Sequence, residues 1–422
     1  MLGKALQFHG LIRDRHLSAQ ELRSLQERKL RALVQHAYHQ VPYYRSLFQS
    51  SGLAPEDIRT PNDLPRIPVT RKEDLRAAGL PNIVAQGTDP SRCVILHTSG
   101  STGKPFAVYV SHGEATLRKM LQFRAVLSVG FRPWEHLVIL GPSVPGPSRL
   151  RYRLGIYRTD VILGTWPVDR QLGMLQEMRP SILWAYPSVL EPVLRTAIKS
   201  GSRIHPRLLV TSAEMLPERL RDRVQRDLGV PIFNFYGAME VGRIAVECAE
   251  HRGLHVEADQ LILECLRDGQ PVPLDTPGEV VVTALEGFTM PFIRYRLDDV
   301  CQLKSSPCSC GCAFPLIEGL QGAESDLVQL PSGKLLSDMF VFILRRLDWI
   351  DQYLVVQESL NRFVVLLVAQ DVPSQEVLEQ LRGELVRSLG EPVQLSFEWV
   401  EQIPPQPRKV GGFVSRLAPP TA

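Results

Sequence analysis

The centre of the chain alternates short apolar runs with amphipathic segments. Four runs that read as buried strands are Leu137–Leu140, Ile182–Ala185, Leu208–Thr211 and Pro231–Phe235. Segments with apolar residues at helical spacing lie between or beside them: Gly113–Ser128, Gln171–Met178, Ser188–Lys199 and Pro217–Leu228. Short apolar strands that alternate with helices are typical of a parallel sheet with helices on its faces. The pattern therefore predicts an α/β core.

The pattern changes after residue 260. Leu261–Leu263, Val280–Val282 and Phe292–Tyr295 are apolar runs joined by turns, with no helical segment between them, which favours a β-rich subdomain. Beyond residue 326 we expect a smaller α+β unit. Its main predicted elements are a helix, two strands, a helix and a strand: Asp338–Leu347, Gln352–Gln357, Phe363–Val368, Ser374–Ser388 and Val393–Val400.

A helix is predicted near the N-terminus. Ser18 and Glu21 have the spacing of a capping box, and apolar residues follow at helical intervals. The helix should end before Val41, because the residue that precedes a proline avoids the α conformation.

Composition limits the class of protein. The chain has 422 residues, 44% hydrophobic and 22% charged, with a formal net charge of +3. These values are typical of a soluble globular protein of two or three domains, and the small charge predicts no nucleic-acid partner. No signal peptide or membrane-spanning run is apparent in the sequence, so we expect a cytoplasmic protein with no membrane partner. The crowded Cys308, Cys310 and Cys312 argue against a disulfide framework.

A loop rich in hydroxyl groups and glycine lies between two strand-like runs, Cys93–Leu96 and Ala107–Val110. Its glycines and exposed N–H groups suit an anion-binding nest, and Lys104 adds a cation. The loop is not a Walker A motif, because Lys104 precedes a proline and a strand rather than opening a helix. An ordinary surface hairpin is the alternative, and the loop alone does not separate the two interpretations.

Several motifs follow one another in a distinctive order: the loop at 98–105, Ser212–Glu214, Tyr236–Glu240, Arg294–Asp299 and a terminal Lys409. Together they resemble the adenylate-forming, or AMP-binding, superfamily. The passage Lys29–Arg45 is similar to the branch that contains phenylacetate–CoA ligases and CapK-like proteins. The similarity covers nearly the whole chain. It implies a large N-terminal domain, residues 1–324, and a small C-terminal lid, residues 325–422, with the active site in the cleft between them.

The resemblance also implies how ATP is bound. The phosphates would be held by Thr98, Ser99, Gly100, Ser101, Thr102, Gly103 and Lys104. The adenine pocket and its neighbourhood would be formed by Ala213, Glu214, Asn234, Phe235, Tyr236 and Gly237. Glu240 would bind Mg²⁺, and Asp299 would accept hydrogen bonds from the ribose hydroxyls, as suits a carboxylate.

The implied reaction joins a carboxylic acid, by default an aryl or arylacetic acid, to AMP with release of pyrophosphate. Transfer to CoA then gives a thioester. Lys104, Glu240 and Lys409 would be catalytic, with Lys409 on the lid and Asp326 at the hinge. Cations are needed because the attacking carboxylate and the phosphates repel each other. Motif adjacency suggests that the acid pocket is bordered by Tyr186, Ser188 and Ser212.

Three departures from the family pattern keep alternatives open. Met239 stands where a Thr or Ser is usual, Ala323 replaces a hinge arginine, and Arg408-Lys409 replaces a Gly-Lys pair. The first hypothesis is an acid–CoA ligase. The second is an adenylating enzyme that passes the acyl group to an amine, a hydroxyl or a carrier-protein thiol. The third is a non-catalytic nucleotide-binding homologue. The oligomeric state, for which a homodimer is one option, is also open.

A second group of residues has the chemistry of a metal site. Cys248 precedes His255 by seven positions, and the cysteine-rich stretch 308–312 follows. Four N and S ligands in two clusters suit a tetrahedral structural Zn²⁺, and some members of the branch carry such a site. We expect the ligands Cys248, His255, Cys308 and Cys310, with Cys312 and His251 as possible substitutes. Free thiols on two loops are the alternative.

Overall fold

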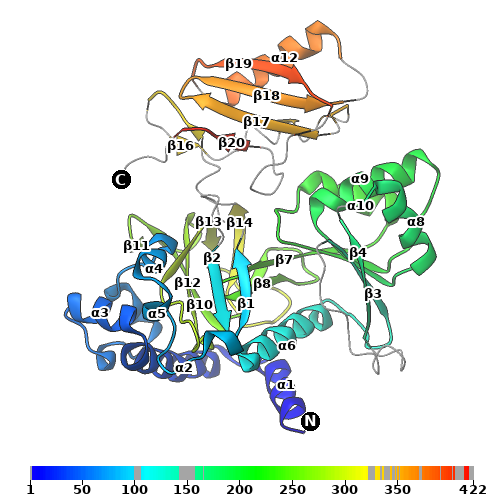
Figure 1. Ribbon diagram of the computed structural model, residues 1–422. Helices are drawn as coiled ribbons and strands as arrows, with labels where there is room; N and C mark the ends of the chain where they lie inside the picture. Colours follow the sequence, from blue (N-terminus) through cyan, green and yellow to red (C-terminus); the bar gives the residue numbers. More distant parts are fainter. Residues whose placement is uncertain are drawn as a thin grey trace.

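The computed structural model of the protein (Figure 1) describes residues 2–98, 106–141, 157–164 and 166–321 without further gaps. In the C-terminal part it describes residues 328–332, 335–336, 343–344, 347, 349–350, 352–369, 373–389, 391–401, 403 and 413–417.

Helices form the N-terminal part of the structure: α1 (Leu2–Asp14), α2 (Ala19–Gln40), α3 (Pro42–Ser50), α4 (Lys72–Ala78) and α5 (Leu80–Ile83), with short 3-10 helices at Pro55–Asp57, Pro61–Arg66 and Pro90–Arg92. The predicted capping box is confirmed, since the Glu21 N–H donates to Ser18 Oγ and the Ser18 N–H donates to Glu21 Oε2. The predicted end before Val41 is also confirmed. The helices α1, α3, α4 and α5 were not predicted from the sequence.

The parallel half of the main sheet contains β4 (Arg158–Leu163), β3 (His136–Gly141), β5 (Ile182–Ala185), β6 (Leu208–Ser212) and β7 (Ile232–Ala238), side by side in that order. The four strands that the sequence predicted are confirmed. Helices α8 (Val168–Met178), α9 (Pro187–Lys199) and α10 (Glu218–Leu228) share one hydrophobic cluster with these strands, and α6 (His112–Ser128) shares another. The sheet is thus covered by helices as an α/β core requires.

The β-rich region continues the same sheet. β7 pairs antiparallel with β8 (Gly242–Glu247), and further strands extend the sheet to twelve. These are β9 (Leu254–Val256), β14 (Leu316–Gln321), β13 (Tyr295–Leu303), β12 (Gly278–Ala284), β10 (Leu261–Arg267) and β11 (Gln270–Pro271). The expected strand Phe292–Tyr295 is wrong, because β13 begins only at Tyr295. Arg294 has φ 45°, and its guanidinium donates to the carbonyl oxygen of Ile67 at 2.5 Å.

The hydroxyl- and glycine-rich loop belongs to a β-hairpin. β1 (Val94–Thr98) and β2 (Phe106–Val110) pair antiparallel, so the two predicted strands are confirmed. Phe106 packs in the same hydrophobic cluster as Tyr236 of β7, which brings the hairpin to the main sheet. Residues 99–105 lie outside the described residues.

The C-terminal part forms an α+β unit with its own hydrophobic core, drawn in orange and red above the main body in Figure 1. Its sheet has the order β19 (Gln394–Trp399), β18 (Arg362–Val368), β17 (Gln352–Ser359) and β20 (Phe413–Ser415), with α12 (Gln375–Leu389) packed on it. A short pair, β15 (Val328–Gln329) and β16 (Leu335–Leu336), precedes it. The predicted helix at 338–347 falls largely outside the described residues. The expected domain boundary at 324 also lies outside them.

No helix in the described segments has both the length and the apolar character needed to cross a bilayer.

Candidate active site

The turn between β7 and β8 carries Glu240 at the edge of the main sheet. Gly237 is required there, because a Cβ at this position would lie 2.7 Å from the carbonyl oxygen of Gly242. Gly242 itself has φ +82°, which favours glycine. Arg118 of α6 donates to the carbonyl oxygens of Met239 at 2.7 Å and Glu240 at 2.6 Å. The backbone of the turn is therefore held from two sides.

Glu240 is only 5% exposed, and two polar groups among the described residues contact its carboxylate. The Tyr295 hydroxyl donates to Glu240 Oε1 at 3.0 Å, and Lys72 Nζ lies 3.3 Å from the same oxygen. A backbone bridge between Thr70 and Tyr295 brings the start of α4, and with it Lys72, to this position. Lys72 was not predicted as a site residue, since nothing in its local sequence indicates a contact with a residue 168 positions away.

Tyr236 and Asp299 form a second polar pair beside Glu240. The Tyr236 hydroxyl donates to Asp299 Oδ2 at 2.5 Å. Burial, and then the negative charge of Asp299, raises the pKa of Tyr236 well above its usual value, so the phenol stays protonated and keeps donating. Since β13 supplies both Tyr295 and Asp299, three residues that the sequence predicted, Tyr236, Glu240 and Asp299, come together through one strand.

The ends of β6 and β7 supply other predicted residues. Ala213 has φ 70°, an unusual conformation for a residue with a Cβ and one that concentrates at functional sites. Asn234 lies two positions before Tyr236 and therefore on the same face of β7. In the described part of the chain its buried Oδ1 has no hydrogen-bond partner. This oxygen is an acceptor available to an amino group.

The residues predicted for the acid pocket are placed in part. Tyr186 starts α9 beside Gly141, and burial together with the Glu214 carboxylate raises the pKa of its phenol. Ser212 Oγ accepts a hydrogen bond from Trp184 Nε1 at 2.8 Å. For Thr98 and Ser188 only the backbone is described. The remaining predicted site residues lie outside the described residues: Ser99, Gly100, Ser101, Thr102, Gly103, Lys104, Asp326 and Lys409.

A family model described as AMP-binding enzyme matches residues 13–286. The chain belongs to this family. It is 27% identical to the phenylacetate-coenzyme A ligase of Thermus thermophilus, over 95% of this chain and 97% of that protein. It is 29% identical to the phenylacetate-coenzyme A ligase of Escherichia coli, over 68% of each chain. The protein CapK of Staphylococcus aureus is 20% identical, over 92% of this chain and 87% of that protein.

Solved structures agree with the fold of this AMP-binding enzyme. 2-Hydroxyisobutyryl-CoA ligase, in the postadenylation state in complex with 2-HIB-AMP, superposes with a TM-score of 0.78 at 18% identity, covering 96% of this chain and 91% of that chain. The same ligase in complex with 2-HIB-AMP and CoA gives a TM-score of 0.66 at 19% identity, covering 96% and 92%. The predicted α/β fold with its small C-terminal unit is confirmed.

The AMP-binding enzyme also brings together the four residues predicted to bind zinc. Potential ligand atoms of Cys248, His255, Cys308 and Cys310 all lie within 4.8 Å of one another. The Sγ atoms of Cys248 and Cys308 are 3.7 Å apart, and Cys310 Sγ is 3.2 Å from His255 Nε2. His255 Nδ1 lies 3.0 Å from the carbonyl oxygen of Phe314, a contact that leaves Nε2 directed at the thiols.

The two possible substitutes for this cluster have other contacts. His251 Nδ1 lies 3.0 Å from Glu247 Oε1, and Cys312 Sγ lies 3.7 Å from the carbonyl oxygen of Arg15. Neither belongs to the group of four residues. The geometry thus favours the ligand set chosen from the sequence.

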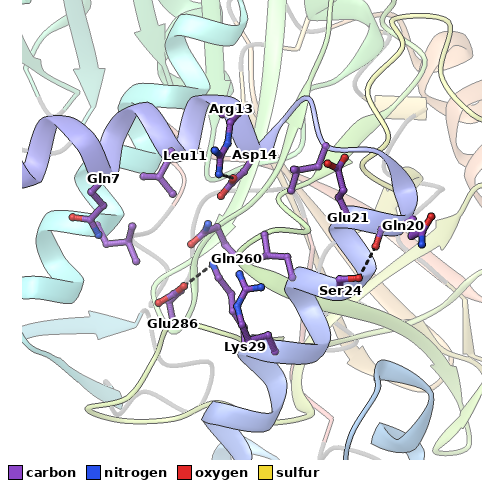
Figure 2. Close-up of a pocket in the computed structure, with 15 residues that line it drawn as sticks. Gln7, Leu11, Arg13, Asp14, Gln20, Glu21, Ser24, Lys29, Gln260 and Glu286 are labelled. Carbon is purple, nitrogen blue, oxygen red and sulfur yellow. Dashed lines mark hydrogen bonds and ion pairs between the residues drawn. The ribbon is translucent and has the colours of Figure 1, made fainter.

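A cavity of about 630 Å³ lies between α1 and α2 (Figure 2). Its lining includes Asp14, Lys29, Gln260 and Glu286, and Lys29 Nζ is 2.5 Å from Glu286 Oε1. None of the predicted site residues lines it. This cavity is separate from the polar pairs at the β7–β8 turn.

Proposed function

We propose that this AMP-binding enzyme activates a carboxylic acid with ATP as an acyl-adenylate, releases pyrophosphate and transfers the acyl group to CoA as a thioester. The observation that carries the proposal is the convergence of Glu240 and Asp299, each fixed by a tyrosine hydroxyl, at one edge of the main sheet. Relatives named phenylacetate-coenzyme A ligase, and a structural neighbour solved with an acyl-adenylate and CoA, support it.

The side chains suit a nucleotide. Asp299 is a carboxylate that can accept hydrogen bonds from vicinal hydroxyls of a ribose, and Tyr236 holds it in place. The Oδ1 of Asn234, which has no hydrogen-bond partner among the described residues, can accept a hydrogen bond from an exocyclic amine such as that of adenine.

A magnesium ion fits the oxygen chemistry of Glu240, and when bound it would offset charge on the phosphates. Such an ion has to share the Glu240 carboxylate with Lys72, whose ammonium already partly neutralises it. Lys72 and Arg118 keep the turn cationic and ordered while an anionic substrate approaches.

The test is acid-dependent exchange between ATP and pyrophosphate over a panel of aryl and arylacetic acids, followed by mass detection of CoA thioesters. Exchange together with a thioester is the expected result. Exchange without a thioester would favour an amine, a hydroxyl or a carrier-protein thiol as acceptor. ATP binding without exchange for any acid would favour a non-catalytic homologue.

The lid is part of the proposal: residues 325–422 would rotate about Asp326 and bring Lys409 to the phosphates, beside the loop at 98–104. Lys409→Ala should abolish pyrophosphate exchange while ATP still binds, because the lysine acts on charge that develops during adenylation. Arg416→Ala, which removes a cation elsewhere on the same unit, is the matched control and should keep its exchange rate. Unchanged exchange in Lys409→Ala would show that the lysine is misassigned.

We also propose a structural Zn²⁺ at Cys248, His255, Cys308 and Cys310. Two thiolates bound to one zinc ion at about 2.3 Å lie about 3.7 Å apart, close to the spacing found here for Cys248 and Cys308. Purified protein should contain equimolar zinc by elemental analysis. Cys308→Ser should lose it, whereas Cys312→Ser, a neighbouring cysteine outside the cluster, should retain it. Wild-type protein free of zinc would remove the site.

A further inference from the structure

Arg243 lies in β8, three residues after Glu240, and its guanidinium is placed against two aromatic rings. The guanidinium carbon is 4.8 Å from the ring centroid of Phe235 and 5.5 Å from that of Trp184. The two rings pack edge to face, with centroids 5.4 Å apart. These contacts fix the position of a positive charge beside the β7–β8 turn.

The charge of Arg243 is not neutralised by the described part of the chain, where no carboxylate oxygen lies within 4.0 Å of the guanidinium. Its Nη2 donates to the neutral side chain of Gln122 on α6, and its buried Nε has no hydrogen-bond partner there. Burial alone lowers the pKa of Arg243 to about 9. A partly buried guanidinium with no carboxylate partner among the described residues gains from pairing with an anion, so this site suits an incoming carboxylate.

The strand geometry places Arg243 on the side of the sheet opposite the proposed ribose contact. Consecutive strand residues point to opposite faces, so Phe235 and Tyr236 face different ways. Tyr236 points to Asp299, whereas Phe235, which the resemblance assigned to the adenine pocket, packs with Trp184 and Arg243 on the other face. The Glu240 turn follows β7, and its carboxylate lies on the Tyr236 side, where it accepts a hydrogen bond from Tyr295. Arg243 pairs with Gly237 at the same end of β7 but on the other face, which is the side left to the acid when the nucleotide occupies the Tyr236 face.

We infer that Arg243 binds a second anionic group of the substrate, so that the preferred substrate is a dicarboxylic acid. One carboxylate is adenylated at the Glu240 turn, and the other pairs with the guanidinium. The inference rests on the proposed acid activation and adds the class of acid. The planar guanidinium can bind a carboxylate through two parallel hydrogen bonds, and Phe235 and Trp184 hold it in position.

The test compares kcat/KM for pyrophosphate exchange with phenylacetate and with a phenylacetate that carries a carboxylate on the ring. Wild-type protein should prefer the dicarboxylate by at least about tenfold, which corresponds to about 1.4 kcal/mol. Arg243→Gln should lose this preference through a lower value for the dicarboxylate. Its value for phenylacetate and its affinity for ATP should not fall.

A second variant keeps the arginine. Gln122→Glu places a carboxylate where Nη2 of Arg243 now donates to an amide oxygen, so the cation is neutralised within the protein. The preference for the dicarboxylate should disappear in Gln122→Glu and persist in Gln122→Ala, the matched control. Thermal unfolding of each variant checks that the fold is retained.

Other outcomes would overturn the inference. A wild-type enzyme that activates phenylacetate at least as well as the dicarboxylate has no use for a second anion. An equal loss for both acids in Arg243→Gln would mean that the guanidinium binds the reacting carboxylate, and weaker ATP binding would mean that it binds phosphate. Each of these three results would leave the proposed acid activation standing. If no acid supported pyrophosphate exchange, the proposed acid activation itself would be wrong.

Discussion

Two arginines that contact or belong to α6, one buried and one partly buried, have opposite electrostatic surroundings. Arg124, on α6 itself, is 1% exposed and contacts the Glu257 carboxylate. It also donates to both carboxylate oxygens of Asp259, at 2.6 and 2.8 Å. Arg243, reached by Gln122 of the same helix, contacts aromatic rings and an amide but no carboxylate within the described residues. The charge of Arg124 thus holds parts of the protein together, whereas we propose that the charge of Arg243 is available to a ligand.

The position of each arginine agrees with this distinction. The Arg124 network joins α6 to the residues between β9 and β10, and its Nη1 also donates to the carbonyl oxygen of Leu11 in α1 at 2.8 Å. It fixes the helix that presents Arg118 and Gln122. Arg243 lies at the end of the helix-covered sheet, beside the Glu240 turn. Two positions apart on α6, Arg124 pairs with two carboxylates, whereas Gln122 contacts an arginine that has no carboxylate partner among the described residues.

The largest effect on stability is expected for Arg124→Met. The substitution leaves Glu257 and Asp259 buried without their main cation, which costs about 3–5 kcal/mol when one partner of a buried ion pair is removed. Urea unfolding should show a clearly lower midpoint, while Arg23→Met, at an exposed position of α2, should not change it. A wild-type midpoint for Arg124→Met would contradict a structural role for the network.

Arg243→Met should change the free energy of unfolding by about 1 kcal/mol or less, in either direction. No described carboxylate is left unpaired, and an apolar side chain between Phe235 and Trp184 replaces a charge that burial penalises. The same urea experiment measures it. If Arg243→Met lost as much free energy of unfolding as Arg124→Met, the charge of Arg243 would have to be neutralised inside the protein. The two arginines would then not differ in the way described above.

The smallest effect is expected for a third, half-exposed arginine, Arg207, which pairs with Glu135 at 2.6 Å. Burial opposes ionisation of Glu135, but hydrogen bonds from Arg207 and from the Arg132 N–H outweigh it and lower the pKa of the carboxyl. The pKa of Glu135 is lower in the folded than in the unfolded protein. The pair therefore stabilises the fold fully when the pH is above the pKa of the unfolded state. The contribution is lost as pH falls through the folded pKa.

Arg207→Gln should therefore lower stability at neutral pH by about 1 kcal/mol or less, since a half-exposed pair is screened by solvent. The difference from wild type should shrink as the carboxyl becomes protonated in both proteins. Urea midpoints measured at neutral pH and at about pH 3 test this, since the pKa of an unperturbed Glu is about 4.3. If the difference in urea midpoint between wild type and Arg207→Gln grew on acidification, the pKa of Glu135 would be raised, not lowered, in the folded protein.

Much of the fold could be predicted, because buried strands and amphipathic helices leave a strong local pattern. Ile182–Ala185 was predicted with its observed bounds, and α9 and α10 were predicted with their observed last residues and first residues off by one. The run Phe292–Tyr295 has three β-forming residues out of four, yet its first three residues are not in a strand. Arg294 there turns into a left-handed conformation to bind carbonyl oxygens of a distant loop. Such contacts leave no trace in local periodicity.

Some residues of the candidate site could likewise be predicted from the sequence, and others could not. Tyr236, Glu240 and Asp299 were found from motif order and do converge in the structure. Lys72 and Arg243 were missed. Lys72 reaches Glu240 only through the bridge from Thr70 to Tyr295, and Arg243 is notable only for the absence of a described carboxylate near it, a property of the folded chain. Residues such as these, whose role depends on their neighbours in the fold, can be identified only from the structure.

The most direct test of the account is acid-dependent pyrophosphate exchange in the wild-type protein and in Glu240→Gln, measured side by side at saturating ATP. The amide is nearly isosteric with the carboxylate, so the turn held by Arg118 should persist. Wild-type protein should exchange only when an acid is present, and Glu240→Gln should be slower by about 10²–10³-fold, as for loss of one electrostatic group at a reacting centre. Equal exchange rates in the two proteins would contradict the assignment of the β7–β8 turn as the place of reaction.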